Sequence, residues 1–190
     1  PARAYLLWAL AYADVWEGDS WNIMAEVLED LNDNRDQLDM FSRASLGLAI
    51  HRLVEEVTEE WQPRLKEWAA QIASELESAA IVEGNATHWS AEGQAKYSWL
   101  NNDVEVTSQV LRLLVEVKPD SERIEPAVRW LMSVRRGKHW RSTKDTAAAV
   151  LALSAYLERA QELAPNYTAV VQVNGKQVAS AAFSAADVFA

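Results

Sequence analysis

Three stretches of this sequence have the composition of helices without a polar face. They are Ala4–Ala13, Ala44–Ile50 and Ala147–Leu157, which contain no charged residue in ten, seven and eleven positions. Val104–Val117 is similar, because only three of its residues are charged. A helix that is apolar all round must be surrounded by other elements. The sequence therefore predicts an inner layer of buried helices near residues 4–14, 40–54, 103–117 and 143–160.

Three further segments have an apolar stripe at helical spacing and a polar opposite side. They are Trp21–Leu31, about 61–80 and about 122–136, and they alternate along the chain with the apolar helices. This alternation predicts antiparallel helical hairpins in which amphipathic helices cover buried ones. The fold class that we expect is mainly α, as part of an α/α toroid. The inner helices begin at unequal intervals, which argues against a strict short-repeat array.

After Pro165 the hydrophobic period changes from helical to alternating. Asn174-Gly175 stands between two β-type runs, a strong signal for a two-residue type I′ turn. We expect strands over 167–173 and 176–183, with Val171 opposite Val178. Because an isolated hairpin is marginally stable, it should begin a β-domain that continues elsewhere. The expected division is a partial toroid over 1–164 and a β-hairpin over 165–190, both cut from a longer protein.

Composition excludes several classes of function. The chain contains no cysteine, so it cannot form a disulfide, a thiolate metal site or a cysteine nucleophile. Its formal net charge of −10 repels phosphate backbones, and nucleic acid is therefore not an expected partner. No apolar run approaches the roughly 20 residues that a membrane-spanning helix needs, so this segment should not insert into a membrane.

The histidine and acidic residues are the candidate metal ligands of this sequence. His51 and Glu55 lie one helical turn apart, but a zinc site needs at least three protein ligands, and the sequence favours a surface pair. Four aspartates recur every three residues without the ligand pattern of a calcium loop, so we interpret them as helix-end and capping residues. These aspartates are Asp30, Asp33, Asp36 and Asp39.

Two His-Trp dipeptides precede inner helices. We expect Trp89 and Trp140 to close the end of the helix layer, and His88 and His139 to face solvent. The segments that follow are Asn102–Glu105 and Ser142–Asp145, and both have the pattern of a capping box. Asp103 and Asp145 could alternatively form a carboxylate pair in a toroid's cavity, as in toroid glycosidases, but capping is the favoured interpretation.

A basic segment, RRGKHWRSTK at 135–144, interrupts an otherwise acidic chain. Two of its five cations should complement the carboxyl end of a helix, and the others could dock on an acidic neighbouring domain. It lacks the glycine and serine or threonine pattern of a phosphate loop. The glycosylation sequons at Asn85 and Asn166 are of a kind that occurs often by chance. The sequence thus predicts no catalytic, cofactor-binding or metal-binding residue.

Residues 127–157 resemble the end of the thioester-containing domain of alpha-2-macroglobulins and complement components. That family's pattern is Trp-Leu, then Gly-x-x-Trp, then Ser-Thr-x-Asp-Thr before an alanine-leucine helix. Here it reads Trp130-Leu131, Gly137 to Trp140, and Ser142–Thr146. Residues 99–117 resemble the preceding inner helix, and the hairpin resembles the strands that follow the helical domain. The likeness is specific over 99–175 and closest to bacterial members.

The resemblance implies a terpenoid-cyclase-like α/α toroid and a non-catalytic role for this part of it. The family's thioester comes from a Cys-x-Glu-Gln motif, and some members add a histidine; both are expected before residue 1. The resemblance further implies that the intact protein traps proteases, that this part contacts sibling domains, and that it lies outside the cytoplasm, periplasmic or secreted and often membrane-anchored. The alternative is a toroid enzyme of the terpene cyclase, prenyltransferase or carbohydrate-active class. The first two need an Asp-x-Asp-Asp motif or a zinc site, which this sequence lacks.

Overall fold

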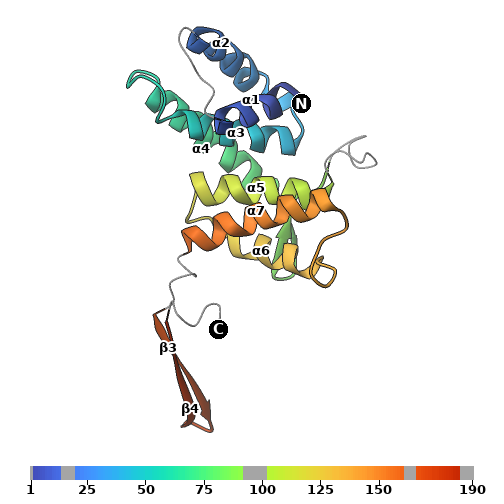
Figure 1. Cartoon of the computed structure of the whole chain (residues 1–190), viewed down its shortest axis with the longest axis vertical. Coiled ribbons are helices and arrows are strands. Elements are labelled where there is room, and N and C mark those ends of the chain that lie inside the picture. Colours follow the sequence, from blue (N-terminus) through green and yellow to red (C-terminus); the bar gives the residue numbers. More distant parts are fainter. Residues whose placement is uncertain (1, 14–19, 92–101, 161–165, 185–190) are drawn as a thin grey trace. The chain divides into compact units, whose positions relative to one another are not determined.

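The computed structural model describes residues 2–13, 20–91, 102–160 and 166–184 (Figure 1). The chain divides into two compact units, Pro1–Leu153 and Ser154–Ala190. The described residues form seven α-helices, one 3-10 helix and two antiparallel hairpins. The helices are α1 (Ala2–Ala13), α2 (Ser20–Asp33), η1 (Arg35–Gln37), α3 (Met40–Leu53), α4 (Gln62–Ser78), α5 (Asp103–Val117), α6 (Ile124–Ser133) and α7 (Thr143–Arg159). The hairpins are β1 (Ile81–Glu83) with β2 (Ala86–His88), and β3 (Tyr167–Val173) with β4 (Lys176–Phe183).

The core of the first unit is built on α3 and α5. Helix α3 packs against α1, α4 and α5, and most residues of both α3 and α5 are buried. The two helices approach closely at Gly47, where an added Cβ would lie 2.9 Å from Leu113 Cδ1 and 3.1 Å from Ile72 Cγ2. The prediction that segments 40–54 and 103–117 form buried inner helices is confirmed.

The other two helices predicted for the inner layer, α1 and α7, are only partly covered. Helix α1 buries Ala4, Leu7 and Ala11, whereas its Leu6 is 58% exposed. Helix α7 buries Asp145, Ala149 and Ala152, whereas its Leu151 is 54% exposed. The prediction that these helices are fully surrounded is therefore wrong for the part of the chain that the structure describes. An apolar composition favours burial of a helix, but it does not indicate which neighbouring element covers each face.

The three amphipathic helices bury one face each, as their patterns predict. Helix α2 buries Met24, Leu28 and Leu31, while Glu26 and Asp30 are exposed. Helix α4 buries Leu65, Trp68, Ile72 and Leu76, and α6 buries Ile124, Ala127, Trp130 and Leu131. Of these helices, α4 packs against both α3 and α5, and α6 packs against α5.

A short hairpin between α4 and α5 was not predicted. Strands β1 and β2 pair antiparallel around Gly84-Asn85, and Gly84 has a φ of +61°. A glycine with positive φ at the first central position is typical of a type II′ turn, and this dipeptide was the available sequence signal. Strand β2 packs against α6, so the hairpin brings His88 and Trp89 into the core.

The second unit contains the hairpin predicted after Pro165. Strands β3 and β4 have the predicted bounds, and the φ angles of Asn174 and Gly175, 53° and 75°, are those of a type I′ turn. The register differs from the prediction, because an irregularity at Val171/Gln172 pairs Val171 with Ala179 and not with Val178. Every residue of both strands is exposed.

Among the described helices, none combines the length and apolar character that crossing a membrane requires.

Candidate functional site

The sequence repeat around the two His-Trp dipeptides is also a repeat in structure. The indole N–H of Trp89 donates to the carbonyl of Leu76 at 2.6 Å, and that of Trp140 donates to the carbonyl of Leu131 at 2.8 Å. Leu76 and Leu131 are each the third residue from the end of the preceding amphipathic helix. The last carbonyls of a helix lack the partner that the next turn would supply, and each indole donates to one of them. The carbonyl of Leu76 also accepts a hydrogen bond from the N–H of Ala79 at 3.1 Å.

The backbone of each tryptophan is held by a threonine of the following helix. The N–H of Trp89 donates to the Thr107 hydroxyl at 3.0 Å, and that hydroxyl donates to the Trp89 carbonyl at 3.2 Å. The N–H of Trp140 donates to the Thr146 hydroxyl at 3.1 Å, which donates to the carbonyl of Ser142 at 2.8 Å. Each tryptophan thus joins the end of one helix to the start of the next. The prediction that both tryptophans close the helix layer is confirmed.

The two histidines of these dipeptides have different surroundings. His139 is exposed, as predicted, and its Nδ1 lies 2.5 Å from the carbonyl oxygen of Trp140. The prediction that His88 faces solvent is wrong. His88 is 8% exposed and stacks on Trp130, with ring centroids 4.7 Å apart and an angle of 10° between the planes. The reason is the β1–β2 hairpin, which packs His88 against α6.

Asn102 and Ser142 cap the starts of α5 and α7 as predicted, but Glu105 binds Lys144 and does not complete the predicted capping box at α5. Asn102 Oδ1 accepts hydrogen bonds from the N–H groups of Val104 and Glu105, and Ser142 Oγ accepts one from the N–H of Asp145. Two contacts also join the two helix starts. The amide of Asn102 donates to Asp145 at 2.7 Å, and Lys144 Nζ lies 2.9 Å from the nearly buried carboxylate of Glu105.

The carboxylates of Asp103 and Asp145, the alternative candidates for a cavity pair, accept hydrogen bonds from the loops and helix starts around them. Asp103 accepts hydrogen bonds from the Ser90 hydroxyl at 3.0 Å and the Ala91 N–H at 2.8 Å. Asp145 is 1% exposed and accepts a hydrogen bond from Ser142 at 2.7 Å. These contacts support the structural interpretation, because both carboxylates organise the loops that start a helix.

The aspartate series that precedes α3 also has a structural role. Asp39 accepts a hydrogen bond from the N–H of Ser42 at 2.7 Å and is the N-cap of α3. Asp30 lies 2.8 Å from Arg3 in an ion pair. Within the described residues, no group of three or more His, Cys, Asp or Glu side chains could hold a metal ion.

The basic segment 135–144 runs from the end of α6 into α7 and contains a tight turn. Arg136 and His139 pair across the turn, and Gly137 has a φ of +65°. Arg135 and Arg136 follow the end of α6 at Ser133, so the prediction that they occupy a helix's last turn is wrong. With Lys138 they are exposed and form no ion pair with any residue that the structure describes. Lys144 and Arg141, by contrast, pair with buried Glu105 and Asp145 at 2.9 and 3.5 Å.

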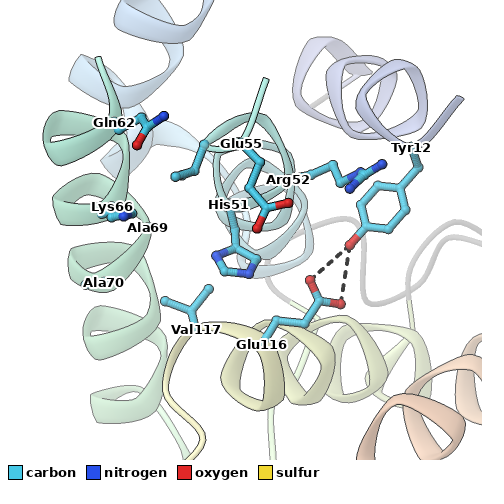
Figure 2. Close-up of a pocket in the computed structure, with 11 residues that line it drawn as sticks. Tyr12, His51, Arg52, Glu55, Gln62, Lys66, Ala69, Ala70, Glu116 and Val117 are labelled. Atoms are coloured by element: carbon cyan, nitrogen blue, oxygen red, sulfur yellow. Dashed lines mark hydrogen bonds between the residues drawn. The ribbon is translucent and has the colours of Figure 1, made fainter. Parts of the chain in front are cut away.

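A cleft of about 900 Å³ lies where several helices of the first unit end (Figure 2). His51 and Glu55, predicted as a surface pair, both line it, although Glu55 lies just beyond the end of α3. The hydroxyl of Tyr12 donates to both oxygens of Glu116, at 3.3 and 3.0 Å. Tyr12 and Glu116 were not predicted to meet, because they are far apart in sequence and belong to no local motif.

The cleft is lined by several polar and charged side chains. Burial, followed by the negative charge of Glu116, raises the pKa of Tyr12 to about 12. Tyr12 therefore stays protonated near neutral pH and acts as a hydrogen-bond donor. The lining otherwise combines His51 with cations and carboxylates, and contains neither a serine nor a threonine.

Comparison with protein families matches residues 62–156 to the family described as the A-macroglobulin TED domain. The matched residues run from the start of α4 into α7, and they include both tryptophan-bearing loops and their threonine partners. No curated protein matches this chain.

Proposed function

Because this chain belongs to the A-macroglobulin thioester-domain family, we propose that it is the non-catalytic, structural part of that domain in a protease-trapping protein. In the proposed arrangement, residues 1–164 are part of an α/α toroid, and the hairpin over 165–190 begins the following β-domain. The observation that carries the proposal is the repeated tryptophan connection, in which Trp89 and Trp140 each join two successive helices of the matched region.

The absence of cysteine from the sequence supports the assignment of a structural role. A thioester requires a cysteine thiolate as the sulfur donor, so this chain cannot supply the family's reactive bond. The carboxylates that an enzyme of the carbohydrate-active alternative would use, Asp103 and Asp145, are engaged in hydrogen bonds with neighbouring loops. In the proposed trapping protein, this segment provides a structural surface that other domains contact.

The partners that we propose are sibling domains of the parent protein and, through the intact protein, proteases. The exposed turn with Arg135, Arg136 and Lys138 supports docking on an acidic neighbouring domain, because these cations have no ion-pair partner among the described residues. Interfaces between domains of one chain are commonly modest in area and polar. The proposed location is extracytoplasmic, periplasmic or secreted, in keeping with the family.

The experiment compares this 190-residue chain with the full product of its native gene against a panel of endoproteases. We expect the full gene product to reduce protease activity toward large protein substrates in a stoichiometric manner, and this chain alone to leave it unchanged. Inhibition by the chain alone would contradict its assignment as a structural part. A full gene product that leaves every protease fully active would contradict the trapping role.

A further inference from the structure

The cleft in Figure 2 is formed by one end each of four helices. Tyr12 belongs to the last turn of α1, His51 and Arg52 to that of α3, and Glu116 to that of α5. Gln62 and Lys66 come from the first two turns of α4. The volume of about 900 Å³ lies near the upper end of the range of small-molecule sites, which is roughly 300–1,000 Å³.

Most charged side chains that line the cleft have no hydrogen-bond or ion-pair partner among the described residues. Arg52, Glu55 and Lys66 form no side-chain hydrogen bond or ion pair within the described part of the chain, and the same holds for His51. Only Glu116 is bound, by the hydroxyl of Tyr12. Oppositely charged groups therefore share one cleft without neutralising one another through direct contact, which leaves them free to bind a ligand.

The charges of the lining are balanced. Arg52 and Lys66 provide two positive charges, and Glu55 and Glu116 provide two negative ones. The helix ends add partial charges, because a helix is negative at its carboxyl end and positive at its amino end. A cation is therefore favoured near the ends of α3 and α5, and an anion near the start of α4, beside Lys66. A ligand with one charge would leave part of this lining unsatisfied.

We propose that this cleft binds a short peptide through its two charged termini. The ammonium group lies near Glu55 and Glu116, and the carboxylate lies near Lys66 at the start of α4. A peptide fits better than a free amino acid because the cleft has the volume of a site for larger ligands. This site is independent of the proposed role in protease trapping, since none of its charged groups belongs to the tryptophan-bearing loops.

The probe is trialanine, which carries both terminal charges and no charged side chain. Titration of the 190-residue chain with trialanine, followed by NMR chemical shifts, should show saturable binding with a dissociation constant in the millimolar range. N-acetyl-trialanine lacks the ammonium group, and trialanine amide lacks the carboxylate. Each should bind about two- to fivefold more weakly, as expected for the loss of one partly exposed ion pair.

Two exposed lining residues allow each terminus to be tested separately. Glu55→Gln should weaken binding of trialanine and of trialanine amide, but not of N-acetyl-trialanine. Lys66→Gln should weaken binding of trialanine and of N-acetyl-trialanine, but not of trialanine amide. Glu59→Gln and Lys138→Gln make the same charge changes at exposed positions outside the cleft and should leave all affinities unchanged.

The binding measurements test the peptide site whether or not the protein traps proteases. Circular dichroism of each variant checks that the helices are retained. Selective loss of affinity in the pattern above would support a site for peptide termini. The absence of saturable shifts with trialanine would overturn it, and so would equal affinities for the free and the blocked peptides.

Discussion

Trp89 and Thr107 are joined by two hydrogen bonds, one in each direction, between the tryptophan backbone and the threonine hydroxyl. Both residues are 0% exposed, so water cannot replace either bond. The pair fixes the loop after β2 on the second turn of α5. Thr146 binds the N–H of Trp140 in the corresponding place at the start of α7. The repeated His-Trp segments thus connect successive helices.

The first prediction concerns this connection. Thr107→Val keeps the shape of the side chain but leaves the buried N–H and C=O of Trp89 without partners. We expect a loss of about 1–3 kcal/mol in the free energy of unfolding, measured by urea denaturation. Thr146→Val is the matched control, and it should cost less because Thr146 is partly exposed to water. Equal costs at the two positions would contradict the role given to burial.

A second prediction concerns the close approach of α3 and α5. Gly47→Ala should gain about 1 kcal/mol in helix propensity, but its Cβ would lie 2.9 Å from Leu113 Cδ1. Overpacking of a core costs roughly 1–3 kcal/mol, so we expect a net loss of stability. In a Leu113→Ala background the contacts with Leu113 are removed and only the one at 3.1 Å from Ile72 Cγ2 remains, so the same substitution should cost less stability. A double-mutant cycle measures this coupling, and additive effects would refute the steric explanation.

The third prediction uses the contact between Tyr12 and Glu116. The pKa of Tyr12 is raised from 10.0 to about 12, so the folded state retains the proton more tightly than the unfolded state. The stabilisation is fully present below pH 10 and is lost as the pH rises toward 12. Subtracting the ultraviolet tyrosinate titration of Tyr12→Phe from that of the wild type isolates this residue. Glu116→Gln should lower its pKa but not to 10.0, because burial remains; an unchanged pKa would contradict the contribution of Glu116.

The fourth prediction concerns stability in acid. Burial raises the pKa of Glu77, but hydrogen bonds from Lys118, at 2.5 Å, and from Ser121 outweigh it, so the pKa lies below its ordinary value of 4.5. Glu77 therefore stabilises the fold above pH 4.5, and this contribution is lost as the pH falls through the lowered pKa. Urea unfolding across this range should show a smaller loss for Glu77→Gln than for the wild type. An equal loss of unfolding free energy in the two proteins would show that the Glu77–Lys118 ion pair does not contribute to the acid sensitivity.

Much of the fold could be predicted from local patterns. The apolar composition of 40–54 and 103–117 predicted buried helices, and Asn174-Gly175 predicted the bounds and turn of the C-terminal hairpin. The register of that hairpin could not be predicted, because an irregularity at Val171/Gln172 shifts the pairing of Val171 to Ala179. The exposure of α1 and α7 was also missed, since the covering of an apolar face depends on tertiary neighbours.

The sites were predicted less completely than the helices. The caps at Asn102 and Ser142 follow from short motifs, because a capping side chain binds backbone groups two or three residues away. The burial of His88 depends on a hairpin that packs on α6, and no motif around His88 specifies that contact. Tyr12 and Glu116 meet at the cleft although they are 104 residues apart in the sequence. Contacts of that kind arise from the packing of helices, and no local sequence pattern indicates them.

The central claim is that this chain is a structural part of a thioester domain and carries no reactive bond of its own. The most direct measurement is the intact mass of the 190-residue chain after incubation with methylamine, a small nucleophile that opens thioesters. Because the chain has no cysteine and a thioester needs a thiolate, the mass should remain that of the unmodified chain. A covalent methylamine adduct in stoichiometric yield would contradict the account and would identify a reactive acyl group in this segment.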